Sequence, residues 1–212
     1  MTRWSLALLA AVALAAASCS PTTSTALTPA GLERGPDGWH AIAVDGEERL
    51  PSVTLARTDG TPFVLPDDAL GTPTLLYFGY TSCPDICPIH LAAISSAMAT
   101  TGVSFDELDV LFVSVDPARD TPERIDEYLA NFDRRITGLH GDLATVSDAI
   151  AQLDLPGPVV EGPDPRGDGD LVGHPAHVIG FDAAGAGRRV WPFGARRADW
   201  VDDLPRVIEE WS

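Results

Sequence analysis

The fold of this chain is decided by residues 74–88, which read TLLYFGYTSCPDICP. The first seven are apolar or aromatic-rich and predict a strand buried on both faces. This strand leads directly to Cys83 and Cys87, each of which is followed by a proline. Apolar residues at helical spacing come next, and proline suits the first position of a helix. We therefore expect a helix that begins at Pro84 or Pro88, with both sulfurs at or beside its N-terminus.

The two cysteines form a chemical site, because the helix dipole and the free N–H groups at a helix N-terminus favour thiolate over thiol. Side chains four residues apart on a helix share a face, with Cβ atoms about 5–6 Å apart. This spacing is compatible with a structural disulfide, with an exchange-active dithiol, or with two ligands of one soft metal ion. A disulfide would close too small a loop to constrain the unfolded chain much. The cysteines alone leave the three interpretations open.

Hydrophobic periodicity and turn residues predict the remaining elements, and their order is thioredoxin-like. The expected fold class is α/β, with a central mixed sheet flanked by helices and an N-terminal strand or hairpin extension. The expected elements are short strands or a hairpin at 39–44 and 53–57, with turns at 45–46 and 59–60; buried strands at 74–80 and 109–115; helices up to about 100, from 122, at 143–153 and at 200–211; a long loop at 156–170; and an antiparallel hairpin of 176–181 and 188–193.

Length and charge limit the classes of function. The chain has 212 residues and a net charge of −17, from 14 basic and 31 acidic residues. This length fits one globular domain with extra segments. The negative charge repels phosphate backbones, so we expect no nucleic-acid partner.

The N-terminus resembles a bacterial export signal. Arg3 provides positive charge, residues 6–17 form an apolar core, and small residues precede Cys19. Residues 16–18 before this cysteine resemble a lipobox, although Ala16 replaces the commoner Leu, and ordinary cleavage nearby is the alternative. Three cysteines in an exported protein leave one unpaired, and lipidation of Cys19 would account for it.

This interpretation divides the chain into three parts. They are a signal peptide (1–18), a lipidated tether (19–38) that is rich in Thr, Ala and Pro, and a thioredoxin-like domain (39–212). The expected location is the extracytoplasmic face of the cell membrane, with the protein held there by a lipid anchor.

A histidine distinguishes a metal site from a redox pair. His174 stands between the long loop and the next predicted strand, which in a thioredoxin-like layout passes beside the cysteine-bearing helix. Two thiolates and one imidazole form a soft site that suits copper, whereas a structural zinc site normally has four protein ligands. His177 should point away from His174, and His90 is expected to be a surface residue beside the site.

The motifs together closely resemble the Sco/SenC copper chaperones. The matching segments are 78–88 (FGYTSCPDICP), 114–123 (SVDPARDTPE) and 172–182, within a resemblance that covers about 50–211. It implies a thioredoxin fold that binds Cu(I) or Cu(II) through Cys83, Cys87 and His174. It also implies delivery of copper, or of reducing equivalents, to the dinuclear copper site of cytochrome c oxidase subunit II or another copper protein. Family members usually have Asp before this histidine, where Gly173 stands here.

Two hypotheses about function follow. The first is a copper metallochaperone. The second is a thiol–disulfide oxidoreductase, with Cys83 and Cys87 as its redox-active pair, that works with a thiol–disulfide reductant and keeps partner cysteines reduced for metal loading. Only the first requires a histidine at His174. A peroxide-reducing enzyme is disfavoured, because the close cysteine pair provides no distant resolving cysteine.

The lipid anchor is testable by replacing Cys19. Acylation should keep the exported protein in the membrane fraction, so Cys19→Ala should release or misprocess it. Fractionation and intact mass measure both effects. An unchanged mass and an unchanged membrane association of the variant would contradict the lipoprotein hypothesis.

Overall fold

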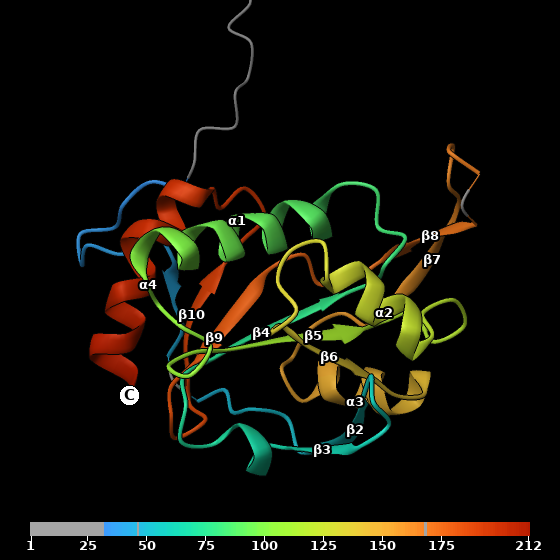
Figure 1. Ribbon diagram of the computed structural model, residues 1–212, viewed down its shortest axis with the longest axis horizontal. Coiled ribbons are helices and arrows are strands. Elements are labelled where there is room, and N and C mark those ends of the chain that lie inside the picture. The colour runs from blue at the N-terminus through green and yellow to red at the C-terminus, as the bar shows by residue number, and fades with distance from the viewer. Residues whose placement is uncertain (1–31, 46, 168) are drawn as a thin grey trace, which may run out of the picture.

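An eight-stranded mixed sheet forms the centre of the described chain (Figure 1). The computed structural model describes residues 32–45, 47–167 and 169–212, so the predicted signal peptide and Cys19 lie outside the described residues. The strands are β1 (Ile42–Ala43), β2 (Val53–Arg57), β3 (Pro62–Leu65), β4 (Thr74–Gly79), β5 (Asp109–Ser114), β6 (Thr137–His140), β7 (Val159–Pro163), β8 (Asp170–Gly173), β9 (Val178–Phe181) and β10 (Gly187–Trp191). The order in the large sheet is β1-β10-β9-β4-β5-β6-β2-β3, and β7 and β8 form a separate two-stranded ribbon.

Strand β4 lies in the middle of this sheet and is buried along its whole length. It pairs in parallel with β5 and antiparallel with β9, and β5 pairs in parallel with β6. Strands with neighbours on both sides and with both faces covered require continuous apolar sequence. The buried strands predicted at 74–80 and 109–115 are therefore confirmed, each one residue shorter than expected.

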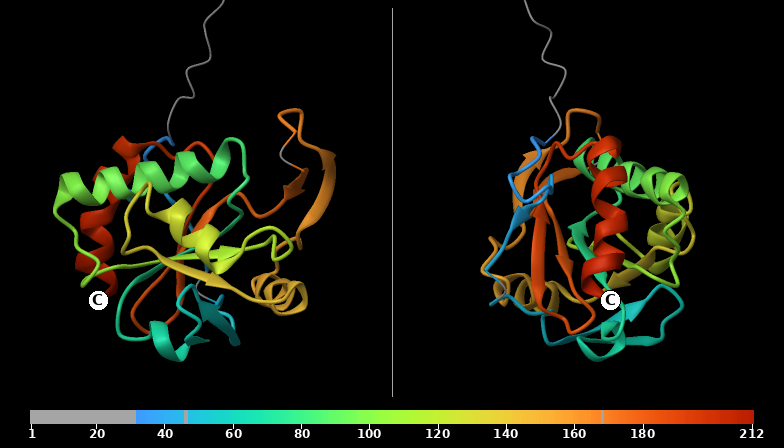
Figure 2. Two further views of the ribbon diagram at one scale, coloured as in Figure 1. Left: turned by 45° about the vertical axis from the view of Figure 1, so that its right-hand side comes forward. Right: turned by 90° about the vertical axis from the view of Figure 1, so that its left-hand side faces the viewer.

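The described chain contains four α-helices and one short 3-10 helix, η1 (Asp67–Ala69). The α-helices are α1 (Ile86–Thr101), α2 (Pro122–Leu129), α3 (Leu143–Ala151) and α4 (Arg197–Trp211). Helices α1 and α4 pack against each other, and Figure 2 shows both beside the sheet. Helix α1 begins between the two expected prolines, and the Thr121 side chain caps α2, which starts at Pro122 as predicted. Within the described residues, no helix is both long and apolar enough to span a bilayer.

The connection β4-α1-β5, followed later by β9-β10-α4, is the thioredoxin-like arrangement expected from the sequence. Strand β6, which was not predicted, pairs with β5 and extends the sheet beyond it. The N-terminal hairpin consists of β2 and β3, which pair antiparallel across the Asp59-Gly60 turn. Strand β1 instead pairs with β10 at the far edge of the sheet, so a hairpin between 39–44 and 53–57 is wrong.

The prediction of a loop at 156–170 is also wrong, because most of this segment belongs to the β7–β8 ribbon. The ribbon projects from the body of the molecule in both Figure 1 and Figure 2. Glycine and proline normally interrupt strands. Here Gly162 has a φ of 117° and lies at an irregularity in the pairing. The pairing continues on both sides of this irregularity, so Gly162 does not end the ribbon.

Residues ahead of β1 lie against α4. The N–H of Leu32 donates to the Asp199 carboxylate at 3.0 Å. Asp203 of α4 is fully buried and accepts hydrogen bonds from the N–H of Ala41 and from the indole N–H of Trp191. Buried carboxylates require such donors. Among the described residues, contacts with α4 therefore extend back to Leu32.

Candidate metal centre

Cys83 and Cys87 flank the start of helix α1. Cys83 lies in the turn after β4, and Cys87 is the second residue of the helix. The Asp85 carboxylate between them accepts the N–H of Ile86 and caps the helix. Both cysteines are free thiols, Cys87 is fully buried and Cys83 is 8% exposed. The predicted position of the sulfurs at a helix N-terminus is confirmed.

The absence of a side chain at Gly79 allows Cys87 to lie against the end of β4. A Cβ atom at this position would lie 2.8 Å from the Cys87 sulfur and 2.8 Å from the Phe112 ring. The buried Tyr77 hydroxyl, also on β4, donates a hydrogen bond to Cys87 Sγ at 3.3 Å. Contacts with strand β4 thus fix the position of the Cys87 sulfur.

His174 reaches this pair of cysteines from the end of the β7–β8 ribbon. Its Nε2 lies 3.6 Å from Cys87 Sγ, although 87 residues separate the two in the chain. The other ring nitrogen, Nδ1, lies 3.0 Å from the carbonyl oxygen of Pro175. A carbonyl can only accept, so Nδ1 carries the proton and Nε2 offers its lone pair to the sulfurs. The predicted position of His174 beside the cysteine-bearing helix agrees with this geometry.

One ligand atom from each of Cys83, Cys87 and His174 lies within 4.8 Å of the other two. In the part of the chain that the structure describes, no other three residues of the metal-binding types form such a group. His40, His140 and His177 are not members of it. Two sulfurs and one imidazole nitrogen on three sides of a small space can hold one soft metal ion.

The two thiols differ in acidity because Cys83 accepts hydrogen bonds, whereas Cys87 is more deeply buried. The hydrogen bond from the Cys87 thiol lowers the pKa of Cys83 to about 4, against the opposing effect of burial. Burial raises the pKa of Cys87 well above its usual value, and the neighbouring Cys83 acts in the same direction. Burial likewise raises the pKa of Tyr77, so its hydroxyl remains a donor. Without metal, Cys83 is therefore the more acidic of the two thiols.

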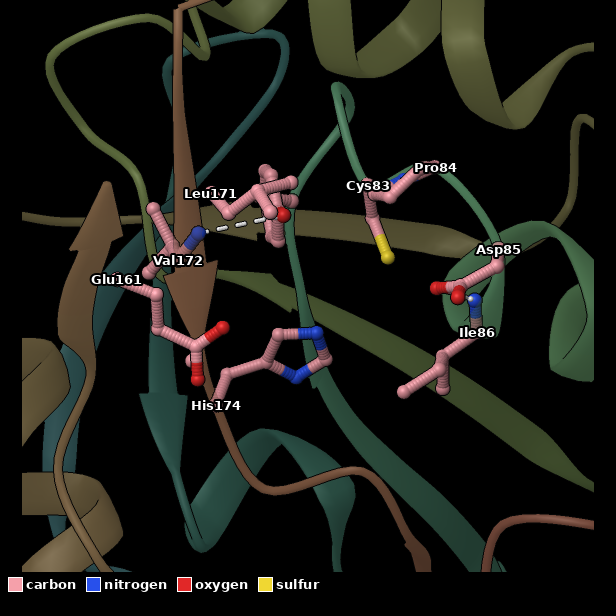
Figure 3. A pocket seen from close by; sticks show the side chains of 10 residues that line it. Cys83, Pro84, Asp85, Ile86, Glu161, Leu171, Val172 and His174 are labelled. Carbon is pink, nitrogen blue, oxygen red and sulfur yellow. Dashed lines mark hydrogen bonds between the residues drawn. The ribbon is translucent and has the colours of Figure 1, made fainter. Parts of the chain in front are cut away.

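A pocket opens from the site to the surface on the side of Cys83 and His174 (Figure 3). It is lined by Tyr80, Cys83, Pro84, Asp85, Ile86, Glu161, Leu171, Val172, Gly173 and His174. Cys87 and Tyr77 do not line the pocket. A partner would therefore reach Cys83 and His174 first.

Buried polar contacts hold the turn that carries Cys83. The Asp120 carboxylate accepts hydrogen bonds from the N–H and the hydroxyl of Thr81, and from the Ser114 hydroxyl. The Arg166 guanidinium, which reaches over from the ribbon, donates to the carbonyl of Ser82 at 3.1 Å. Charge-assisted hydrogen bonds of this kind fix backbone geometry more firmly than neutral ones. These supporting residues and Tyr77 were not among the predicted site residues.

The prediction that His90 lies on the surface is wrong, because this residue is fully buried. It is three residues after Cys87 and its Nε2 lies 3.2 Å from the carbonyl oxygen of Ala176, just beyond His174. Its ring also packs against Tyr77, with 5.4 Å between ring centroids. Burial lowers the pKa of His90 to about 4, so the ring is neutral and Nε2–H is the donor. His90 thus connects the cysteine-bearing helix to the segment after His174.

The topology and the site define the class: a thioredoxin-like protein with two cysteines and a histidine arranged as metal ligands. The chain belongs to the SCO1/SenC family, whose pattern it matches over residues 48–209. It is 35% identical over 146 residues to the protein sco1 of Schizosaccharomyces pombe, a match that covers 68% of this chain and 54% of that protein. The chain therefore spans about half of the length of this curated relative.

Solved structures show the same fold with copper present. The structure of Bradyrhizobium japonicum ScoI with copper bound has a TM-score of 0.63 and 30% identity, covering 73% of this chain and 96% of that one. The structure of yeast Sco1 with copper bound has a TM-score of 0.65 and 27% identity, covering 78% of this chain and 91% of that one. These similarities confirm the expected family and fold class.

The unequal acidity of the two thiols predicts a pH profile for alkylation of the reduced, metal-free protein. Because a lowered pKa keeps Cys83 deprotonated down to about pH 4, its alkylation rate should change little between pH 7 and pH 5. An ordinary thiol, with a pKa of about 8.5, would slow about 100-fold over this range. Mass spectrometry of short iodoacetamide pulses should find Cys83 modified before Cys87.

A matched variant tests the cause of this acidity. Cys87→Ala removes the main hydrogen-bond donor, so the alkylation midpoint of Cys83 should rise. A 100-fold drop in the rate for the parent protein, or preferential labelling of Cys87, would contradict the assignment of the thiolate.

Proposed function

We propose that this protein is a membrane-anchored, extracytoplasmic copper metallochaperone that binds Cu(I) or Cu(II) through Cys83, Cys87 and His174. The observation that carries this proposal is the convergence of two sulfurs and one imidazole nitrogen within 4.8 Å. Membership of the SCO1/SenC family and the copper-bound structures of two relatives support it.

The ligand types favour copper over the other common metals. Thiolates are soft ligands that suit Cu(I), and imidazole nitrogen suits Cu(II). A structural zinc site normally uses four protein ligands, and the described residues bring three together here. A site with an open side can release its metal to a partner by stepwise ligand exchange. Cys83 and His174 line the open pocket, and Cys87 does not, so a partner thiolate would displace one of the two pocket ligands first.

The proposed recipient is the dinuclear copper site of cytochrome c oxidase subunit II or another copper protein. The motifs at 78–88, 114–123 and 172–182 support this recipient through the family resemblance. Export and acylation of Cys19 would confine the chaperone to the outer face of the membrane, where such a recipient is assembled.

A second function, thiol–disulfide exchange, is favoured by the acidity of Cys83. A thiolate at neutral pH in an open pocket, with a second thiol beside it, is the arrangement of an exchange-active dithiol. In this function, the pair would reduce cysteines of the recipient and would itself be reduced by a thiol–disulfide reductant. The two functions are compatible, because copper requires the reduced pair.

Replacement of His174 separates the two functions. His174→Ala removes the one nitrogen ligand, so Cu(II) affinity should fall by about 100-fold or more, since even supporting contacts of metal ligands contribute 10–100-fold. Cu(I) affinity should fall less, because two thiolates can hold Cu(I) alone. Competition titrations with chelators of known affinity measure both. Exchange with a disulfide substrate should stay within a few-fold of the parent rate, apart from the change in the pKa of Cys83.

His177→Ala is the matched control, because this histidine lies three residues further on and outside the ligand group. The His177→Ala variant should bind Cu(I) and Cu(II) as the parent protein does. If His174→Ala also bound both normally, the histidine would not be a ligand, and the oxidoreductase would be the better account.

A further inference from the structure

The Glu161 side chain lines the pocket that opens beside the three ligands, although it is not a member of the group within 4.8 Å. Residues Val160 and Gly162 of β7 pair with Val172 and Leu171 of β8, which leaves Glu161 as an extra residue at a β-bulge. Bulges re-aim side chains and occur beside functional sites. Here the bulge turns Glu161 across the ribbon toward the end of β8.

Gly173 provides the space that this carboxylate occupies. A Cβ atom at Gly173 would lie 2.5 Å from Glu161 Oε1 and 3.1 Å from Glu161 Cδ. Gly173 directly precedes His174, and Figure 3 shows the Glu161 carboxylate beside the His174 side chain, in the pocket onto which Cys83 opens. Within the described residues, the Glu161 carboxylate has no hydrogen-bond or ion-pair partner. It is a negatively charged oxygen donor in the same pocket as Cys83 and His174.

This position has a consequence for the oxidation state of a bound metal. Cu(I) is satisfied by two or three soft ligands, whereas Cu(II) favours a four-coordinate tetragonal site of harder donors. The three ligands Cys83, Cys87 and His174 leave the site open toward the pocket, and Glu161 is one of the residues that line this pocket. A carboxylate also stabilises a doubly charged ion more than a singly charged one.

We propose that Glu161 sets the oxidation-state preference of this site, because its carboxylate supplies an oxygen ligand to Cu(II) and none to Cu(I). The inference rests on the proposed function, since it assumes that copper binds at Cys83, Cys87 and His174. The sequence does not signal this role, because Glu161 precedes His174 by thirteen residues in a segment that reads as a loop.

Two variants of the full chain test this role in different ways. Glu161→Gln keeps the shape of the side chain and removes its charge. Gly173→Ala leaves Glu161 in the chain and displaces its carboxylate, which is the movable end of a flexible side chain. Gly173 has no positive φ in the described backbone, so the alanine should not strain it. Glu127→Gln is the control, because Glu127 is exposed on α2 and its replacement makes the same change in charge.

The measurements are Cu(I) and Cu(II) affinities by chelator competition, the Cu(II) electron paramagnetic resonance spectrum, and the potential of the bound copper couple. Both test variants should lose about tenfold or more in Cu(II) affinity, and their Cu(II) spectra should change together. Cu(I) affinity should stay within about twofold of the parent value. A tenfold selective loss corresponds to a rise of about 59 mV in the potential of this one-electron couple. The control should match the parent in every measurement.

Three results would overturn the inference. Parent-like Cu(II) affinity and spectra in both test variants would show that the carboxylate is not a ligand. An equal loss of Cu(I) and Cu(II) affinity would show a structural effect without selection. If the parent protein bound neither ion while Glu161 was intact, the proposed function itself would fail, and this inference would fall with it.

Discussion

The contact between the Cys87 sulfur and the backbone of β4 is the constraint on which the site depends. Helix α1 can start this close to the strand because Gly79 has no side chain, and because the Tyr77 hydroxyl donates a hydrogen bond to the Cys87 sulfur. With Cys87 fixed and buried, the preceding turn must place Cys83 at the rim of the pocket. The pair is therefore asymmetric: one sulfur is held by the core and the other faces an incoming partner.

The rest of the site is organised around this asymmetry. Asp120 and Arg166 hold the turn that carries Cys83, and His90 joins α1 to the backbone just after His174. These contacts come from four parts of the chain, so the ligands are held in place before any metal binds. Preorganisation of this kind limits the ordering that binding would otherwise require. The β7–β8 ribbon adds His174 at its end and Glu161 at its bulge.

Most of this arrangement could be predicted from the sequence, and the exceptions have physical reasons. The buried strands were predictable because continuous apolar runs bounded by turn residues have few other structures available. Strand β6 was missed because four residues with a glycine among them carry too little pattern. The ribbon was missed because its glycines and prolines resemble a loop, and because Val159 and Val160 are exposed rather than buried. The ribbon forms because β7 and β8 pair with each other, and local sequence does not encode this pairing.

The candidate ligands were predictable, whereas the residues that support them mostly were not. Cys83 and Cys87 follow from their position after a buried strand, and His174 from its position before β9. Tyr77 and Asp120 act through contacts that form only in the folded protein. His90 is different, because its spacing from Cys87 and Ile94 places it on the buried face of α1, a signal that the surface assignment overlooked.

Copper binding by this site is the central claim, and direct competition between metals tests it most simply. The reduced chain lacking residues 1–31 would be equilibrated with equal amounts of copper and zinc, and its metal content measured after removal of excess metal. The account predicts close to one copper per chain with little zinc, and loss of that copper when the two cysteines are oxidised to a disulfide. Preferential retention of zinc, or copper that remains tightly bound to the oxidised chain, would contradict it.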